Sequence, residues 1–316
     1  AEQWAAAGRS VLPGYAPWDG RDQTLGLLPP TQEALAPGWL GAPNGNSVIG
    51  VAGLLTNSGS TPLPLDLLGW SSDMITYLSH AGVDPEGLPL PYGAADTFLG
   101  VDRSARLLAD ELRRQWILRP GVAVDLVGHS FGGVVVMHYL LTLHDPADPT
   151  LPPIGHVVTL SAPLEGADLA SAAANPVAVV PLIDPVLALA ALVLGGDVAG
   201  QSMADLVVGS PLLAQLAAAW SGAQADPHRS PLATGTRVLT VGGSRDAVVP
   251  DHRADLPGAD HVIVPGGHTA MHESEAVLQV VRAFLAHAEL PAGDSGWGAW
   301  LSGGWTVLQQ SLGIVF

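Results

Sequence analysis

The segment that most constrains how this chain can fold is Gly-His-Ser-Phe-Gly at residues 128–132, directly after the apolar run 122–127. A G-x-S-x-G pattern between a strand and a helix is typical of a sharp turn that lifts the serine above the edge of a sheet. Small residues are needed two positions before and two after the serine, because the backbone packs tightly there. The apolar residues 132–140 can form the helix that follows. The sequence therefore predicts a strand, a strained turn and a helix, with Ser130 as the candidate nucleophile.

Strands and helices alternate along the rest of the chain. Apolar runs predict further buried strands at residues 48–51, 156–160, 237–241 and 261–264. Helices are predicted at residues 74–80, 102–118 and 273–287, the second of them with clear amphipathic spacing. This alternation indicates an α/β fold with a mostly parallel, doubly wound sheet, and sheets of this kind bind ligands at the carboxyl ends of their strands.

Composition narrows the chemistry that the chain can perform. Its length of 316 residues allows one large domain with an insertion or two small domains, and a hydrophobic content of 48% is enough to bury a sizeable core. The net charge of −17 argues against nucleic acid as a partner, because nucleic-acid binding requires a basic surface. The chain contains neither lysine nor cysteine, so Schiff-base chemistry, an S-x-x-K site, thiol catalysis and disulfides are excluded.

Two residues downstream of Ser130 are placed to activate it. A serine hydroxyl becomes a good nucleophile when a base takes its proton, and the base must be oriented by an acid. Asp246 lies in the loop after the strand 237–241, and His268 lies in the loop after the strand 261–264. Both loops open at the sheet edge where Ser130 is expected, so the sequence predicts a catalytic set of Ser130, Asp246 and His268.

Other residues near these loops have simpler interpretations. Three further acids are expected to be solvated loop residues: Asp251, Asp255 and Asp260. His272 lies four residues after His268, a spacing that suits a metal pair, but no HExxH motif and no obvious third ligand accompany it. We therefore expect neither a metal nor an organic cofactor. His129 is expected to line the site or pack beside it rather than to act as the base.

Attack on a carbonyl creates an oxyanion, which needs preorganised hydrogen-bond donors. The first expected donor is the N–H of Phe131, the residue after the serine. The second is expected from the loop after the strand 48–51, where we assign Leu54. The alternative for Leu54 is an ordinary loop residue.

Several segments of the chain resemble bacterial lipases and esterases of the α/β-hydrolase superfamily, most of all exported members of actinobacterial type. The segments that carry this resemblance are residues 124–133, 159–166, 208–213, 242–250 and 265–269. Such lipases often have His-Gly where this chain has Ala52 and Gly53. The resemblance spans residues 48–290 and implies the α/β-hydrolase fold. It also implies an extracellular location, which the surplus of acid suits, although the first residues of the chain contain no recognisable signal peptide.

The segments outside the expected core have distinct compositions. We expect an irregular N-terminal wrap at residues 1–47 and an α/β core formed by residues 48–167 and 231–290. A helical cap or lid insertion is expected at residues 168–230, and a Trp/Gly-rich tail at residues 291–316. Residues 176–194 are nearly all apolar and are expected to form a lid over an acyl-binding cleft. Core helices are the alternative, and a membrane span is disfavoured because Pro181, Asp184 and Pro185 interrupt the stretch. The tail has no assigned role.

Together these features predict a serine hydrolase that cleaves carboxylic esters, as a lipase or esterase, through an acyl-enzyme. The same residues could serve an acyltransferase or a thioesterase. A third hypothesis is a non-enzymatic binding module. The expected substrate is a small-molecule or lipid ester, and a contact with a lipid interface is compatible with the sequence. Acyl chain length, leaving group and oligomeric state are not predicted.

Overall fold

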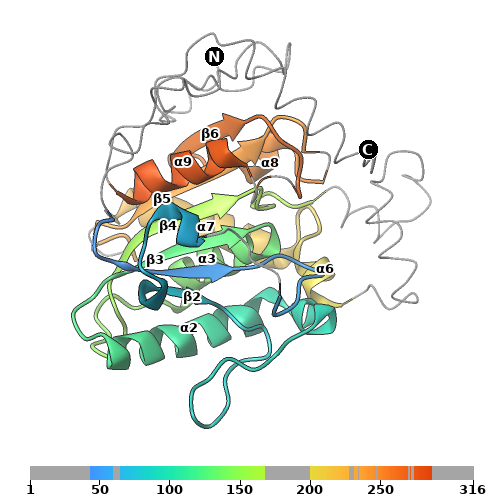
Figure 1. Cartoon of the computed structure of the whole chain (residues 1–316). Coiled ribbons are helices and arrows are strands. Elements are labelled where there is room, and N and C mark those ends of the chain that lie inside the picture. The colour runs from blue at the N-terminus through green and yellow to red at the C-terminus, as the bar shows by residue number, and fades with distance from the viewer. Residues whose placement is uncertain are drawn as a thin grey trace, which may run out of the picture.

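A computed structural model describes residues 43–59, 65–167, 200–227, 231–233, 235–246, 248–269, 271 and 274–286 (Figure 1). Within these residues, six strands form one sheet in the order β2-β1-β3-β4-β5-β6, and every neighbouring pair is parallel. The strands are β1 Ser47–Val51, β2 Ile75–Tyr77, β3 Val124–His129, β4 Ile154–Leu160, β5 Arg237–Gly243 and β6 Asp260–Val264. All the strands predicted from apolar runs are present, so the predicted α/β fold with a mostly parallel sheet is confirmed.

Helices cover both faces of the sheet. The longer ones are α2 Val101–Leu118, α3 Phe131–His138, α7 Pro211–Ala225 and α9 Glu275–Leu285. The short ones are α6 Gln201–Asp205, α8 Asp251–Ala254, the 3-10 turns η1 Leu65–Leu68, η2 Ser72–Met74 and η3 Ala94–Phe98, and the π-helical turn η4 Tyr139–Leu143. In Figure 1, α2 and α9 lie on opposite sides of the sheet.

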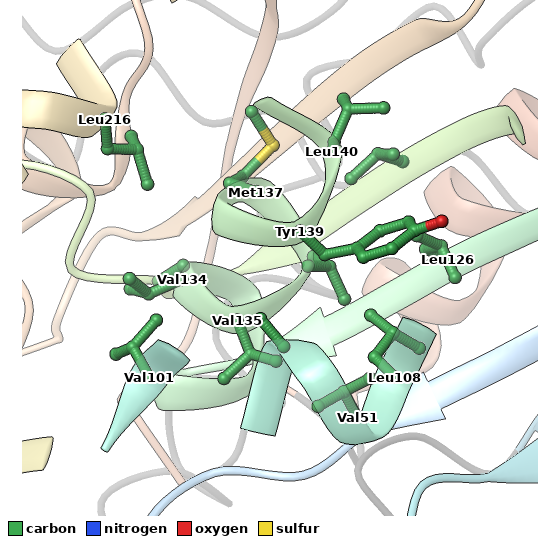
Figure 2. Close-up of a cluster of buried hydrophobic side chains, with 14 of the residues drawn as sticks. Val51, Val101, Leu108, Leu126, Val134, Val135, Met137, Tyr139, Leu140 and Leu216 are labelled. Carbon is green, nitrogen blue, oxygen red and sulfur yellow. The ribbon is translucent and has the colours of Figure 1, made fainter. Parts of the chain in front are cut away.

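Alternation along the strands divides the core into two layers. Leu126 packs with α2 and α3 on one face, whereas its neighbour Val127 packs with α9 on the other. Successive strand side chains point to opposite faces, so a strand that is covered on both faces must be apolar throughout. Figure 2 shows part of the first layer, where side chains from β1, β3, α2 and α3 converge.

The predicted helix at residues 74–80 is wrong. Residues Ile75–Tyr77 form the edge strand β2, which pairs with β1 in parallel. Isoleucine, threonine and tyrosine favour extended backbone, and pairing with a neighbouring strand overrides the weak helical spacing of such a short segment. The helices predicted at 102–118 and 273–287 correspond to α2 and α9.

Part of the predicted insertion belongs to the core. Helix α7 buries Leu213, Leu216 and Trp220 in the layer formed by α2 and α3, and the Trp220 indole donates a hydrogen bond of 2.8 Å to the carbonyl of Pro257. Residues 176–194, on which the lid prediction rests, lie outside the described residues, as do residues 1–42 and 291–316. None of the helices in the described ranges has the length and apolarity that crossing a bilayer requires.

A buried carboxylate ties the amino ends of the central strands together. Asp125 in β3 is fully buried, and it accepts hydrogen bonds from the side chains of Asn44, Asn46 and His156 and from the backbone of His156. Asn44 also donates to the carbonyl of Leu285, at the end of α9. Hydrogen bonds of this kind satisfy a buried charge that would otherwise be very costly. The amino-end network therefore fixes the sheet from the side opposite to the carboxyl ends of the strands.

Candidate active site

Ser130 occupies a strained turn between β3 and α3. Its φ of 54° and ψ of −125° are uncommon for a residue with a side chain. The turn is held by hydrogen bonds from Ser130 N to the carbonyl of Leu160 and from Gly133 N to the carbonyl of Ser130, of 2.8 and 2.9 Å. The predicted strand, turn and helix are therefore all present, and the turn lies at the carboxyl end of the sheet.

The two glycines of the motif are required by backbone contacts. A Cβ at Gly128 would lie 2.4 Å from the carbonyl oxygen of Gly132, and a Cβ at Gly132 would lie 2.1 Å from the carbonyl oxygen of Val51. Real Cβ atoms do not approach backbone this closely. Because Val51 is the last residue of β1, the start of α3 is packed directly against the end of that strand.

The loops after β5 and β6 bring Asp246 and His268 to Ser130. His268 Nε2 lies 2.8 Å from Ser130 Oγ, and His268 Nδ1 lies 2.8 Å from Asp246 Oδ2. Because a carboxylate accepts hydrogen bonds, Nδ1 carries the imidazole proton and Nε2 is free to accept the proton of the Ser130 hydroxyl. The three residues form a continuous hydrogen-bonded chain in the order that proton transfer requires.

The carboxylate of Asp246 is buried, and both of its oxygens accept hydrogen bonds. Its Oδ1 accepts hydrogen bonds of 2.9 and 2.8 Å from the backbone N–H groups of Val248 and Val249. Burial by itself would raise the pKa of Asp246, but the attraction and hydrogen bond of His268, together with the Val249 N–H, outweigh it and lower the pKa below its usual range. Asp246 is therefore ionised at neutral pH and can stabilise a protonated imidazole.

Two further residues lie beside these three. His129 donates from Nε2 to the carbonyl oxygen of His268 at 3.0 Å, and the two rings lie 5.2 Å apart. His129 thus packs beside the site, as predicted. Ser161, directly after β4, is fully buried with a φ of 44° and lies near Asp246. Ser161 lies in one of the segments that carry the resemblance, but no residue pattern in the sequence points to it.

The loop after β1 lies against the nucleophile. A Cβ at Gly53 would lie 3.0 Å from Ser130 Cβ and 3.5 Å from Ser130 Oγ. Leu54, the next residue, is half-buried. Phe131 is the first residue of α3, so its N–H is one of those that a helix cannot satisfy internally. Both predicted oxyanion donors therefore belong to segments that adjoin Ser130.

The three competing acids are not simple solvated loop residues. Asp251 and Asp255 are buried, not solvated. Asp251 packs against Gly242 of β5, Asp255 lies 3.6 Å from His261 Nδ1 in β6, and burial raises the pKa of Asp251. Asp260 forms an ion pair of 2.9 Å with Arg237. His272 lies outside the described residues. In the described ranges, no group of three or more histidine, aspartate or glutamate side chains is arranged to hold a metal ion.

Comparisons with known proteins identify the fold. The family model described as "TAP-like protein" matches residues 205–296, which include Asp246 and His268. The lipase BlEst2 of Bacillus licheniformis, in its propeptide form, is similar with a TM-score of 0.51 and 18% identity, over 78% of this chain and 52% of that chain. This chain has the α/β-hydrolase fold.

Two further structures are similar to this α/β-hydrolase-fold chain. The mature form of BlEst2 has a TM-score of 0.47 and 16% identity, over 83% of this chain and 93% of that one. Phospholipase PlaB from Legionella pneumophila has a TM-score of 0.40 and 20% identity, over 62% of this chain and 39% of that one. No curated protein sequence matches the chain. The likeness to exported actinobacterial members stays a prediction.

Proposed function

We propose that this chain is a carboxylic ester hydrolase in which Ser130 is the nucleophile, His268 the general base and Asp246 the residue that orients it. The observation that carries the proposal is the pair of 2.8 Å contacts from the two ring nitrogens of His268 to Ser130 Oγ and to Asp246 Oδ2. Nucleophile, base and acid in this geometry support acyl transfer through a covalent intermediate. The lipase name of the BlEst2 structure agrees with an ester as substrate.

The proposed reaction has two half-reactions. Ser130 Oγ attacks the ester carbonyl carbon while His268 Nε2 takes the hydroxyl proton, and the resulting oxyanion is held by the N–H groups of Phe131 and Leu54. The intermediate collapses, the C–O bond to the alcohol breaks, and His268 returns the proton to the leaving alcohol. Water then attacks the acyl-enzyme with His268 again as base, which releases the acid and restores the Ser130 hydroxyl.

The substrate that we propose is a small-molecule or lipid ester. An acyl chain that binds in an apolar cleft gains about 0.8 kcal/mol per buried methylene, or up to about fourfold in kcat/KM for each added carbon. A series of p-nitrophenyl esters from acetate to octanoate measures this gain. A rise in kcat/KM with chain length supports a lipid ester, whereas a flat series supports a short-chain esterase.

A fluorophosphonate probe tests the proposed nucleophile. We expect the probe to label the wild-type protein at Ser130 and to leave Ser130→Ala unlabelled, and we expect ester hydrolysis to fall by about 10⁴-fold or more in that variant. Absence of labelling in the folded wild-type protein would overturn the proposal. Product analysis with an added alcohol distinguishes a hydrolase, which releases the free acid, from an acyltransferase, which makes a new ester.

A further inference from the structure

We propose that His80 is a positioning residue that holds the oxyanion loop, defined here as residues 52–56, in register with the helix α3. The inference rests on the proposed function, because it assigns a support to the oxyanion hole of the same site. Three observations support it: the contacts of the buried His80 ring, the hydrogen bonds that fix the carbonyl groups of the loop, and a further hydrogen bond at Leu55.

His80 joins the two segments that are expected to supply the oxyanion donors. Its Nε2 lies 3.2 Å from the carbonyl oxygen of Ala52, at the start of the oxyanion loop. Its ring packs on the ring of Phe131, at the start of α3, with centroids 5.7 Å apart. His80 is fully buried, so a shift of either segment would disturb close contacts on both sides.

The protonation state of His80 follows from these partners. Burial lowers the pKa of His80 to about 4, so the ring is neutral at neutral pH. A carbonyl can only accept, so the single ring proton is on Nε2, and Nδ1 accepts from the hydroxyl of Ser104, 3.2 Å away in α2. The Ala52 carbonyl thereby selects the tautomer with its proton on Nε2, and the hydroxyl of Ser104 can donate to the Nδ1 that is left without one.

Fixing the carbonyls of the loop also fixes its N–H groups. In a trans peptide the C=O of one residue and the N–H of the next point in opposite directions. The carbonyl of Ala52 is held by His80, and the carbonyl of Gly53 accepts a hydrogen bond of 2.8 Å from the hydroxyl of Thr56. The N–H of Leu54 is therefore turned away from Thr56, and its direction depends on the Thr56 contact.

A third anchor holds the end of the turn. Leu55 has a φ of 64°, which is unfavourable for a leucine, and its N–H donates at 3.1 Å to the hydroxyl of the buried Thr97. Tyr92 links the anchors, since its hydroxyl lies 3.3 Å from that of Thr56 and its ring packs edge-on to His80 at 5.2 Å. Three successive peptide groups of the strained loop, from Ala52 to Leu55, are thus held by side chains, which is the preorganisation that oxyanion stabilisation requires.

The rate of Ser130 labelling by a fluorophosphonate tests this role without reference to the natural substrate, because the phosphonyl oxygen occupies the oxyanion hole. His80→Phe keeps a ring against Phe131 but removes the donor to Ala52, and we expect it to lower the labelling rate and kcat by about 10²-fold with little change in KM. His80→Gln places an amide nitrogen where Nε2 was, and we expect it to recover most of the rate.

The control is His144→Phe. His144 is another buried histidine, which contacts the hydroxyl of Tyr139 at 3.0 Å outside the site. We expect this variant to lower the midpoint of thermal unfolding much as His80→Phe does and to leave the labelling rate unchanged. Equal labelling rates for the wild type, His80→Phe and His80→Gln would overturn the positioning role.

If His80→Phe does not fold, Thr56→Val takes its place, because Thr56 is half-buried and valine has nearly the same shape. We expect Thr56→Val to slow labelling by at least 10-fold and Thr56→Ser to restore it. A wild-type rate in Thr56→Val would overturn the proposal that these side-chain contacts hold the oxyanion loop for catalysis. A wild-type protein that is labelled but hydrolyses no ester contradicts the proposed function alone. A folded wild-type protein that is not labelled overturns both.

Discussion

His129 Nε2 lies 3.0 Å from the carbonyl oxygen of His268, so the residue before the nucleophile holds the backbone of the residue that takes its proton. The two residues are 139 positions apart in the chain, and the contact joins the turn after β3 to the loop after β6. The 2.8 Å contact between His268 and Ser130 thus has a second, backbone-level support.

Replacing His129 should therefore weaken catalysis without removing a reacting group. We expect His129→Leu to lower kcat by about 10- to 100-fold, because the backbone of His268 loses the donor that fixes its position. His129→Gln offers an amide nitrogen at the place of Nε2 and should retain most of the activity. Steady-state kinetics measure both, and a wild-type kcat in His129→Leu would contradict the role.

Asp246→Asn should be nearly inactive although it is almost isosteric. Two backbone N–H groups, those of Val248 and Val249, face Oδ1, so the amide oxygen stays on that side and the NH₂ group faces His268. The imidazole must then accept at Nδ1 and carry its proton on Nε2, which is the wrong tautomer for a base. We expect kcat to fall by up to about 10⁴-fold.

Asp110→Asn is the matched control for this substitution, because the Asp110 side chain is 65% exposed and pairs with Arg113 on the surface of α2. Its kcat should equal that of the wild type, since exposed pairs contribute little. Comparable losses in the two variants would show that the fold, rather than the tautomer, is affected.

The buried His80 predicts a pH-dependent stability. Its pKa in the folded state is about 4, below the ordinary value of 6.5, so between these two pH values the unfolded chain binds more protons than the folded one. Stability should therefore fall as pH decreases from about 6.5 towards 4, by up to about 3 kcal/mol from this group. Urea unfolding gives the free energy of unfolding of the wild type and of His80→Gln at each pH in this range. The decrease towards pH 4 should be smaller in the variant, and the difference between the two is the contribution of His80.

The amino-end network around Asp125 should affect stability and not catalysis. Asp125→Asn presents an amide NH₂ group to partners that are themselves donors, and we expect a loss of about 2 to 4 kcal/mol in the free energy of unfolding. The activity of the folded protein should be unchanged, because Asp125 lies at the opposite end of β3 from Ser130. Urea unfolding and specific activity check the two parts, and a stability equal to that of the wild type would contradict the role of the network.

The sequence was informative where one local pattern determines the structure. Buried parallel strands are apolar on both faces, so β3 and β4 could be predicted from their residues alone. The order of Ser130, Asp246 and His268 and their places after strands predicted that they lie together, and they do lie within hydrogen-bonding distance.

The sequence was less informative where contacts between distant segments determine the local structure or the burial of a residue. The pairing of β2 with β1 overrides the helical spacing at residues 74–80, and the short turn of α8 buries Asp255, which looks like a surface acid in the sequence. The contact between His80 and the Ala52 carbonyl joins residues 28 positions apart and has no sequence signature. Supports of this kind depend on tertiary geometry, so residue patterns do not reveal them.

The approach of Gly132 to the Val51 carbonyl also bears on protein engineering. Since backbone meets backbone there, positions 128 and 132 accept no side chain, and a mutant library gains nothing by including them. The oxyanion loop differs, because Leu54 is expected to act through its main chain and its side chain is half-buried. Substitution of the Leu54 side chain therefore keeps the expected main-chain donor, so Leu54, unlike the two glycines, is a position that a mutant library can vary.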